Sequence, residues 1–152
     1  MSLAIREIGV ADQILVEELL DTFEPGWNDA LAPTASGAIA FLTDSNAFMF
    51  GAYEGSTETG RDPVGWLWGM HARRPDGRVM TYVHQLAVHE DHRRRGIASL
   101  LMEQAIGAAR QRKAHKLWLV TRQTNEASNP LYQSLGADFE PDGSQLYTWN
   151  LD

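Results

Sequence analysis

The sequence predicts a single domain of the α/β or α+β layered class, in which a mixed β-sheet is flanked by about four helices. Three observations support this prediction. The chain has 152 residues, a length that suits one domain with its own core. Stretches with the alternation of strands are interleaved with stretches of helical periodicity. No repeat, low-complexity tract or linker divides the chain, so we expect residues 1–152 to form one domain.

The N-terminal part predicts a strand, two helices and the first strands of a meander. A strand is expected at 3–8 and a helix at 10–23, whose leucines and isoleucines share one face. The loop "EPGWNDALAPT" leads to a second helix at 35–43. "AFMFGAY" and "VGWLWGMHA" then predict two strands joined by the turn "STETGRDP".

The C-terminal part predicts strands that alternate with helices. The strand at 79–88, "VMTYVHQLAV", is followed by a helix at about 97–113. "KLWLVT" at 116–121 is a near-continuous apolar run, which is typical of a central strand. A short helix at 127–135 and a last strand, "QLYTWNL", complete the expected order.

Composition excludes several classes of function. The chain has no cysteine, which excludes disulfides, thiolate nucleophiles and cysteine-ligated zinc. Its net charge of −7 argues against a nucleic-acid partner and favours cationic ligands. The apolar fraction of 43% is ordinary for a soluble protein, and no apolar run approaches the ~18 residues of a membrane span. We therefore expect a cytoplasmic protein without a membrane partner.

Against this acidic background, three consecutive arginines, Arg93, Arg94 and Arg95, lie between a predicted strand and a predicted helix. A helix N-terminus offers unpaired N–H groups and the positive end of the helix dipole. Gly96 lets the backbone approach a ligand closely, and the small residues Ala98 and Ser99 keep the first turn narrow. The segment therefore predicts a pyrophosphate site, and the alternative is that the arginines cap the helix and stay solvated.

The same residues resemble a known family. The segment from Arg93 to Ala98 matches the [Q/R]-x-x-G-x-[G/A] signature of the GNAT N-acetyltransferase superfamily. "LAV" at 86–88 precedes it at the usual distance, and "NEASNPLYQSLGA" at 125–137 is similar to a later family segment, with Ser128 where alanine is common. "HQLAVHEDHRRRGIA" is most similar to GNAT-type aminoglycoside 3-N-acetyltransferases, whose aspartate before "LAV" is Gln85 here.

This resemblance implies a mixed, mostly antiparallel seven-stranded sheet, splayed between the strands at 79–88 and 116–121. The co-substrate would be acetyl-CoA, whose pantetheine arm would pair with the strand edge at 86–88. Asn125 would contact the pantetheine, although asparagine equally suits a helix N-cap. The implied coenzyme-binding residues are Leu86, Ala87, Val88, Arg93, Arg94, Arg95, Gly96, Ile97, Ala98, Ser99 and Asn125.

The implied chemistry is direct attack of an amine on the thioester in a ternary complex. Tyr132 stands where the superfamily often has a tyrosine that protonates the leaving thiolate; the alternative is an aromatic core residue. His84 is a candidate base, or else a histidine that faces the core. His84, His89 and His92 lack a metal-binding spacing, so no metal is expected.

The N-terminal helices, their loop and the meander strands are expected to select the acceptor amine. The candidate acceptor residues are Trp27, Asp29, Trp66, Trp68 and Gln85, because aromatic faces with nearby carboxylates suit cations. Trp66 and Trp68 could instead be core or dimer contacts.

The sequence thus predicts an N-acetyltransferase acting on a small cationic amine, an aminoglycoside being one candidate, with a homodimer as an expectation from relatives. The alternatives are an acetyltransferase acting on a protein or peptide amine, and a non-catalytic acyl-CoA-binding module.

Overall fold

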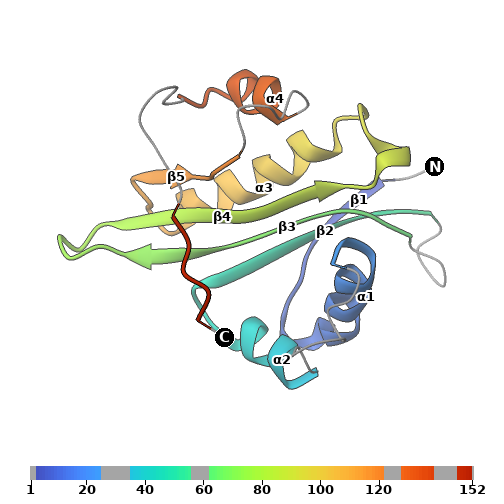
Figure 1. Ribbon diagram of the computed structural model, residues 1–152, viewed down its shortest axis with the longest axis horizontal. Coiled ribbons are helices and arrows are strands. Elements are labelled where there is room, and N and C mark those ends of the chain that lie inside the picture. Colours follow the sequence, from blue (N-terminus) through green and yellow to red (C-terminus); the bar gives the residue numbers. More distant parts are fainter. Residues whose placement is uncertain (1–2, 25–34, 56–61, 122–127, 139–146, 152) are drawn as a thin grey trace. The chain divides into compact units, whose positions relative to one another are not determined.

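The computed structural model describes residues 3–24, 35–55, 62–121, 128–138 and 147–151 (Figure 1). The chain divides into two compact units, Met1–Leu119 and Val120–Asp152. The first unit contains the β-sheet with three α-helices, and the second contains the helix α4, Ser128–Ser134. In the described part of the chain, no helix has both the length and the apolar character needed to cross a membrane.

The first unit is built on a mixed sheet with the strand order β1-β2-β3-β4-β5. The first four strands pair antiparallel with their neighbours, and β5 lies parallel to β4. Each of the strands from β2 to β5 is thus adjacent in the sheet to the strand that precedes it in the sequence. The strands are β1 Leu3–Glu7, β2 Ala47–Glu54, β3 Asp62–Arg73, β4 Val79–Val88 and β5 Lys116–Trp118.

Helices cover both faces of this sheet. Figure 1 shows α1, Gln13–Phe23, and α2, Ala35–Thr43, on one face, and α3, Ile97–Gln111, on the other. A one-turn 3-10 helix, Val10–Asp12, precedes α1. Burial of a helix stripe against each sheet face produces a layered domain, as the alternation of patterns predicts.

Each face has its own apolar core. Under α1 and α2, the buried side chains of Val16, Leu19 and Met49 pack together with Trp66. On the opposite face, α3 approaches so closely that a Cβ at Gly65 would lie 3.1 Å from Ile97 and 3.2 Å from Leu101. The alternation of the strands therefore serves two cores, one on each side.

The described part of the sheet has five strands, whereas the family resemblance implied seven. β5 ends at Trp118 rather than at 121, and among the described strands it lies at the edge of the sheet rather than in its centre. The predicted last strand lies partly outside the described residues, and its described residues 147–151 form no strand. The apolar residues Val120, Tyr147, Trp149 and Leu151, on which these two predictions depended, are exposed.

Candidate active site

The free edge of β4 is the first element of the site. β4 pairs with β3 along its whole length, but it pairs with β5 only from Met80 to Tyr82. Among the described residues, the edge of β4 that faces β5 is therefore unpaired over 83–88. The predicted splay between the strands at 79–88 and 116–121 would lie here, and it stays a prediction, because β5 ends at Trp118. The unpaired backbone groups of β4 can accept an extended ligand as an added strand.

The loop after β4 forms the second element. Its residues Glu90–His92 make a 3-10 turn, and Gly96, with a φ of 78°, is the N-cap of α3. Arg94 also has a positive φ of 64°. Ile97, the first residue of α3, is buried, and a Cβ added at Gly96 would meet none of the described residues within 4 Å. Within the described part of the chain, the space beside Gly96 at the start of α3 is thus open, and the first N–H groups of a helix can bind an anion in such a place.

The three arginines of this loop have different surroundings. Arg93 donates from Nε to the carbonyl oxygen of Val88 at 3.3 Å. Arg95 forms an ion pair with the buried carboxylate of Glu54. The guanidinium of Arg94 is exposed and has no hydrogen-bond or ion-pair partner among the described residues. Arg94 is therefore the arginine whose charge is most available to a ligand.

A β-bulge shapes the middle of β4. Trp68 is opposite Gln85 and Gly69 is opposite Val83, so His84 is an extra residue in the ladder. Gly69 makes this possible, because a Cβ there would lie 2.1 Å from the carbonyl oxygen of Tyr82. As a result, the neighbours His84 and Gln85 both contact Trp68, although adjacent residues in a regular strand point to opposite faces.

These contacts form a group that we call the acceptor cluster: Glu24, Trp68, Tyr82, His84, Gln85 and Trp118. The His84 ring lies 4.6 Å from the ring of Trp68, and Tyr82 stacks on Trp118 at 4.3 Å between ring centroids. Gln85 accepts a hydrogen bond from Nε1 of Trp68 at 3.0 Å and donates one to the carboxylate of Glu24. The cluster offers aromatic faces and one carboxylate, the chemistry that binds organic cations.

Glu24 was missed by the sequence analysis. It ends α1 and precedes Gln85 by 61 residues, so no spacing in the sequence connects the two. β4 has no carboxylate directly before "LAV", and the structure brings one to Gln85 from the end of the helix instead. Trp66, in contrast, stacks on Phe23 in the core and is 1% exposed, which is the core alternative considered for it.

Comparison with known proteins places this geometry in a family. The sequence model of the acetyltransferase (GNAT) family matches residues 13–137. The chain belongs to this family. It is an acetyltransferase, and the family generally uses acetyl-CoA. Among curated proteins, no sequence matches the chain closely enough to be counted as a relative.

Solved structures of similar fold include two aminoglycoside acetyltransferases from uncultured soil metagenomic samples. HMB0005 is 26% identical, with a TM-score of 0.79 over 98% of this chain and 100% of that one. Meta-AAC0020, in complex with sisomicin, is 18% identical, with a TM-score of 0.81 over 99% and 97%. The ribosomal-protein-alanine N-acetyltransferase of Brucella melitensis biovar Abortus 2308 is 24% identical, with a TM-score of 0.69 over 98% and 100%. The last two likenesses show the fold alone.

Other predicted residues of this GNAT acetyltransferase fall in the second unit or outside the described residues. Tyr132 lies half-buried in α4, within the second unit. Asn125, Trp27 and Asp29 lie outside the described residues. The roles expected of these four residues therefore stay predictions.

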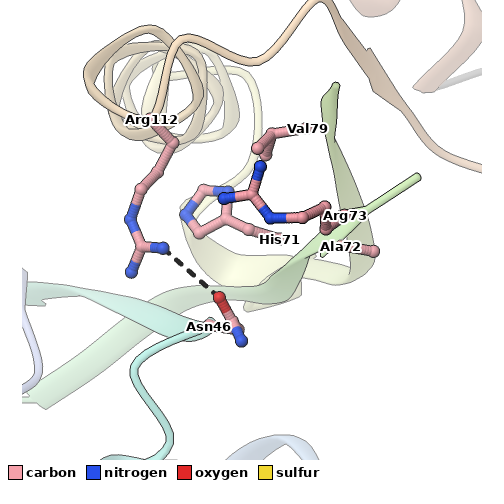
Figure 2. A pocket seen from close by; sticks show the side chains of 6 residues that line it. All are labelled: Asn46, His71, Ala72, Arg73, Val79 and Arg112. Carbon is pink, nitrogen blue, oxygen red and sulfur yellow. Dashed lines mark hydrogen bonds between the residues drawn. The ribbon is translucent and has the colours of Figure 1, made fainter. Parts of the chain in front are cut away.

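A small pocket lies at the far end of α3 from the loop. Figure 2 shows Arg112 pointing toward Asn46, with the ring of His71 beside them. Because α3 has 15 residues, this pocket is about 20 Å from Gly96. Burial, aided by the charge of Arg112, lowers the pKa of His71, whose Nδ1 lies 2.8 Å from Oγ1 of Thr81. His71 is thus held neutral inside the fold, away from the candidate active site. The pocket is lined by Asn46, His71, Ala72, Arg73, Val79 and Arg112.

Proposed function

We propose that this protein transfers the acetyl group of acetyl-CoA to a primary amine of a small cationic molecule, with an aminoglycoside as the first candidate acceptor. The observation that carries the proposal is the acceptor cluster, which joins a carboxylate to aromatic rings. Its residues His84 and Gln85 belong to β4, the strand whose edge toward β5 is unpaired over 83–88 among the described residues. The aminoglycoside is suggested by the name of HMB0005, the neighbour with 26% identity.

The coenzyme would be held by two parts of the chain. The unpaired edge at 86–88 would pair with the pantetheine arm, and the N–H groups after Gly96 would hold the pyrophosphate with the help of Arg94. Acetyl-CoA supplies the activated acetyl thioester. Two features of the described residues support this assignment: the space at Gly96 is open, and the guanidinium of Arg94 has no partner among them.

Glu24 and His84 would prepare the acceptor. An alkyl ammonium group has an ordinary pKa of about 10.4, so it must lose a proton before it can attack. The imidazole of His84 is exposed and can accept that proton, directly or through water. The carboxylate of Glu24 would bind a second ammonium group of a polyamine and so orient the reacting one. Tyr132 would give a proton to the leaving thiolate.

The decisive test is the release of thiol from acetyl-CoA, followed with a thiol reagent over a panel of amines. The panel contains aminoglycosides, arylalkylamines, polyamines, amino acids and short peptides. Because the chain has no cysteine, the enzyme adds no thiol background. Turnover with an aminoglycoside supports the proposal, whereas turnover with peptides alone would replace the small-molecule acceptor by a peptide amine. Coenzyme binding without any turnover would point to a non-catalytic acyl-CoA-binding module.

Variants connect the activity to the cluster. Glu24→Gln removes the carboxylate charge and is expected to raise KM for a polyamine acceptor about tenfold, the size of a charge-assisted hydrogen bond. Glu18→Gln makes the same chemical change at an exposed position of the same helix and should leave KM unchanged. Equal KM values for the two variants would exclude Glu24 from the acceptor site.

A further inference from the structure

A buried charge cluster lies beneath the loop that precedes α3. The carboxylate of Glu54, the last residue of β2, is only 5% exposed. Its Oε2 atom lies 3.0 Å from Nδ1 of His92, and its Oε1 atom pairs with Nη2 of Arg95. The other Nη atom of Arg95 lies 3.1 Å from the same nitrogen of His92. All three side chains therefore contact one another.

The charge of Glu54 needs these partners. A buried carboxylate is unfavourable unless charged or polar groups replace the water it has lost. The hydrogen bond from Arg95 lowers the pKa of Glu54 and outweighs the burial that would raise it, and the positive charge of Arg95 adds to this lowering. Glu54 is thus ionised at neutral pH and draws two loop side chains onto the end of β2.

The two anchored residues flank the part of the loop with unusual backbone angles. His92 ends the 3-10 turn, and Arg95 directly precedes Gly96. Between them, Arg94 adopts a φ of 64°, which is rare for a residue with a side chain. Such a conformation persists when its surroundings hold it. The contacts with Glu54 hold the chain on both sides of Arg94.

We propose that Glu54 is a positioning residue for the coenzyme: through Arg95 and His92 it fixes the loop whose backbone N–H groups receive the pyrophosphate. The inference rests on the proposed function, since it requires that this loop binds acetyl-CoA. It assigns Arg95 to the support of the loop and leaves Arg94 and the backbone to contact the phosphates.

The sign of a charge-removing substitution distinguishes positioning from simple electrostatics. If Glu54 acted only as a negative charge near the site, Glu54→Gln would strengthen the binding of the polyanionic coenzyme. If Glu54 positions the loop, Glu54→Gln weakens binding. We expect the Kd for CoA, measured by isothermal titration calorimetry, to rise about tenfold, which is typical for loss of a supporting contact behind a binding group.

Asp91→Asn is the matched control. It removes a carboxylate charge from the loop itself, where Asp91 is exposed and, among the described residues, pairs with His89 and not with Arg95. Its Kd for CoA should stay equal or fall slightly. Glu54→Asp is the second variant, which keeps the charge but shortens the side chain. If Glu54 positions the loop, this variant binds CoA more weakly. If Glu54 acts only through its charge, the Kd for CoA stays unchanged. Glu54→Asp also decides the matter if Glu54→Gln does not fold.

Steady-state kinetics separate this role from a general loss of structure. The Glu54 variants should raise KM for acetyl-CoA about tenfold and leave KM for the acceptor unchanged, because Glu54 makes no contact with the acceptor cluster. Unchanged or tighter CoA binding in the folded Glu54 variants overturns the inference, as does a parallel rise of both KM values. Failure of the wild-type protein to bind CoA overturns the proposed function and the inference together.

Discussion

Replacing Gly69 by alanine is expected to destabilise the protein, because this glycine forms the β-bulge that presents His84. A Cβ at position 69 would lie 2.1 Å from the carbonyl oxygen of Tyr82 and 2.8 Å from Cζ of Phe48. The carbonyl oxygen belongs to the backbone of the neighbouring strand and cannot rotate away. The strands β3 and β4 must therefore separate locally, and their ladder is weakened at the bulge.

The magnitude follows from the kind of clash. Forcing one extra carbon into a closely packed site costs about 1–3 kcal/mol and more where the backbone must move, so we expect a loss of about 3 kcal/mol. For a chain of this length, each kcal/mol shifts Tm by about 2–4 °C. Gly69→Ala should thus lower Tm by about 6–12 °C.

Gly107→Ala is a control with the same chemical change and the opposite expected sign. Gly107 lies within α3, and a Cβ there would meet nothing within 4 Å. Alanine in a helix is about 1 kcal/mol more favourable than glycine, so this variant should raise Tm by about 2–4 °C. Thermal unfolding followed by circular dichroism measures both variants. A Gly69→Ala protein as stable as the wild type would refute the close approach of β3 and β4 on which the geometry of the acceptor cluster depends.

Three further predictions address charge. Arg94→Gln should weaken CoA binding several-fold and reduce its dependence on salt, measured by titration at 50 and 300 mM NaCl, because an exposed cation is screened. Burial and the charge of Arg112 lower the pKa of His71 in the folded state, so as the pH decreases the unfolded state takes up a proton before the folded state does. Tm should therefore fall as the pH decreases below the ordinary pKa of histidine. This fall should be smaller in His71→Asn. Finally, Gln85→Glu should restore part of the acceptor affinity that Glu24→Gln loses, because it returns a carboxylate to the same contact; a double variant no better than Glu24→Gln alone would contradict that placement.

Local patterns were sufficient to predict most of the elements. The helix at 35–43 and the strand at 79–88 have the predicted bounds, because apolar spacing reports directly on which residues face a core. The pattern failed at 116–121 and at the C-terminus. There, apolar residues such as Val120 and Trp149 are exposed, and a sequence cannot say which apolar residues remain uncovered.

In the candidate site, too, the sequence indicates the residues of a contiguous segment but not those that come from distant elements. The loop from Arg93 to Ser99 could be predicted because its residues are contiguous and follow a known signature. Glu24 and Glu54 could not, because each reaches the site from an element distant in the sequence: Glu24 contacts Gln85 across 61 residues, and Glu54 comes from β2. A lone glutamate at the end of a helix or strand carries no signal until the partner that it meets is known.

If this loop binds the coenzyme as proposed, the different contacts of the three arginines would explain how an acidic protein can bind a polyanion. With a net charge of −7, the chain as a whole repels such a ligand, so the attraction must be local. Arg95 is already neutralised by Glu54, and Arg93 is bonded to the backbone of Val88. Much of the attraction must then come from backbone N–H groups at the start of α3, which are effective only in one loop conformation. On the proposed assignment, Arg93 and Arg95 contribute by holding that conformation. A buried carboxylate beneath the loop would then favour binding of an anion rather than oppose it.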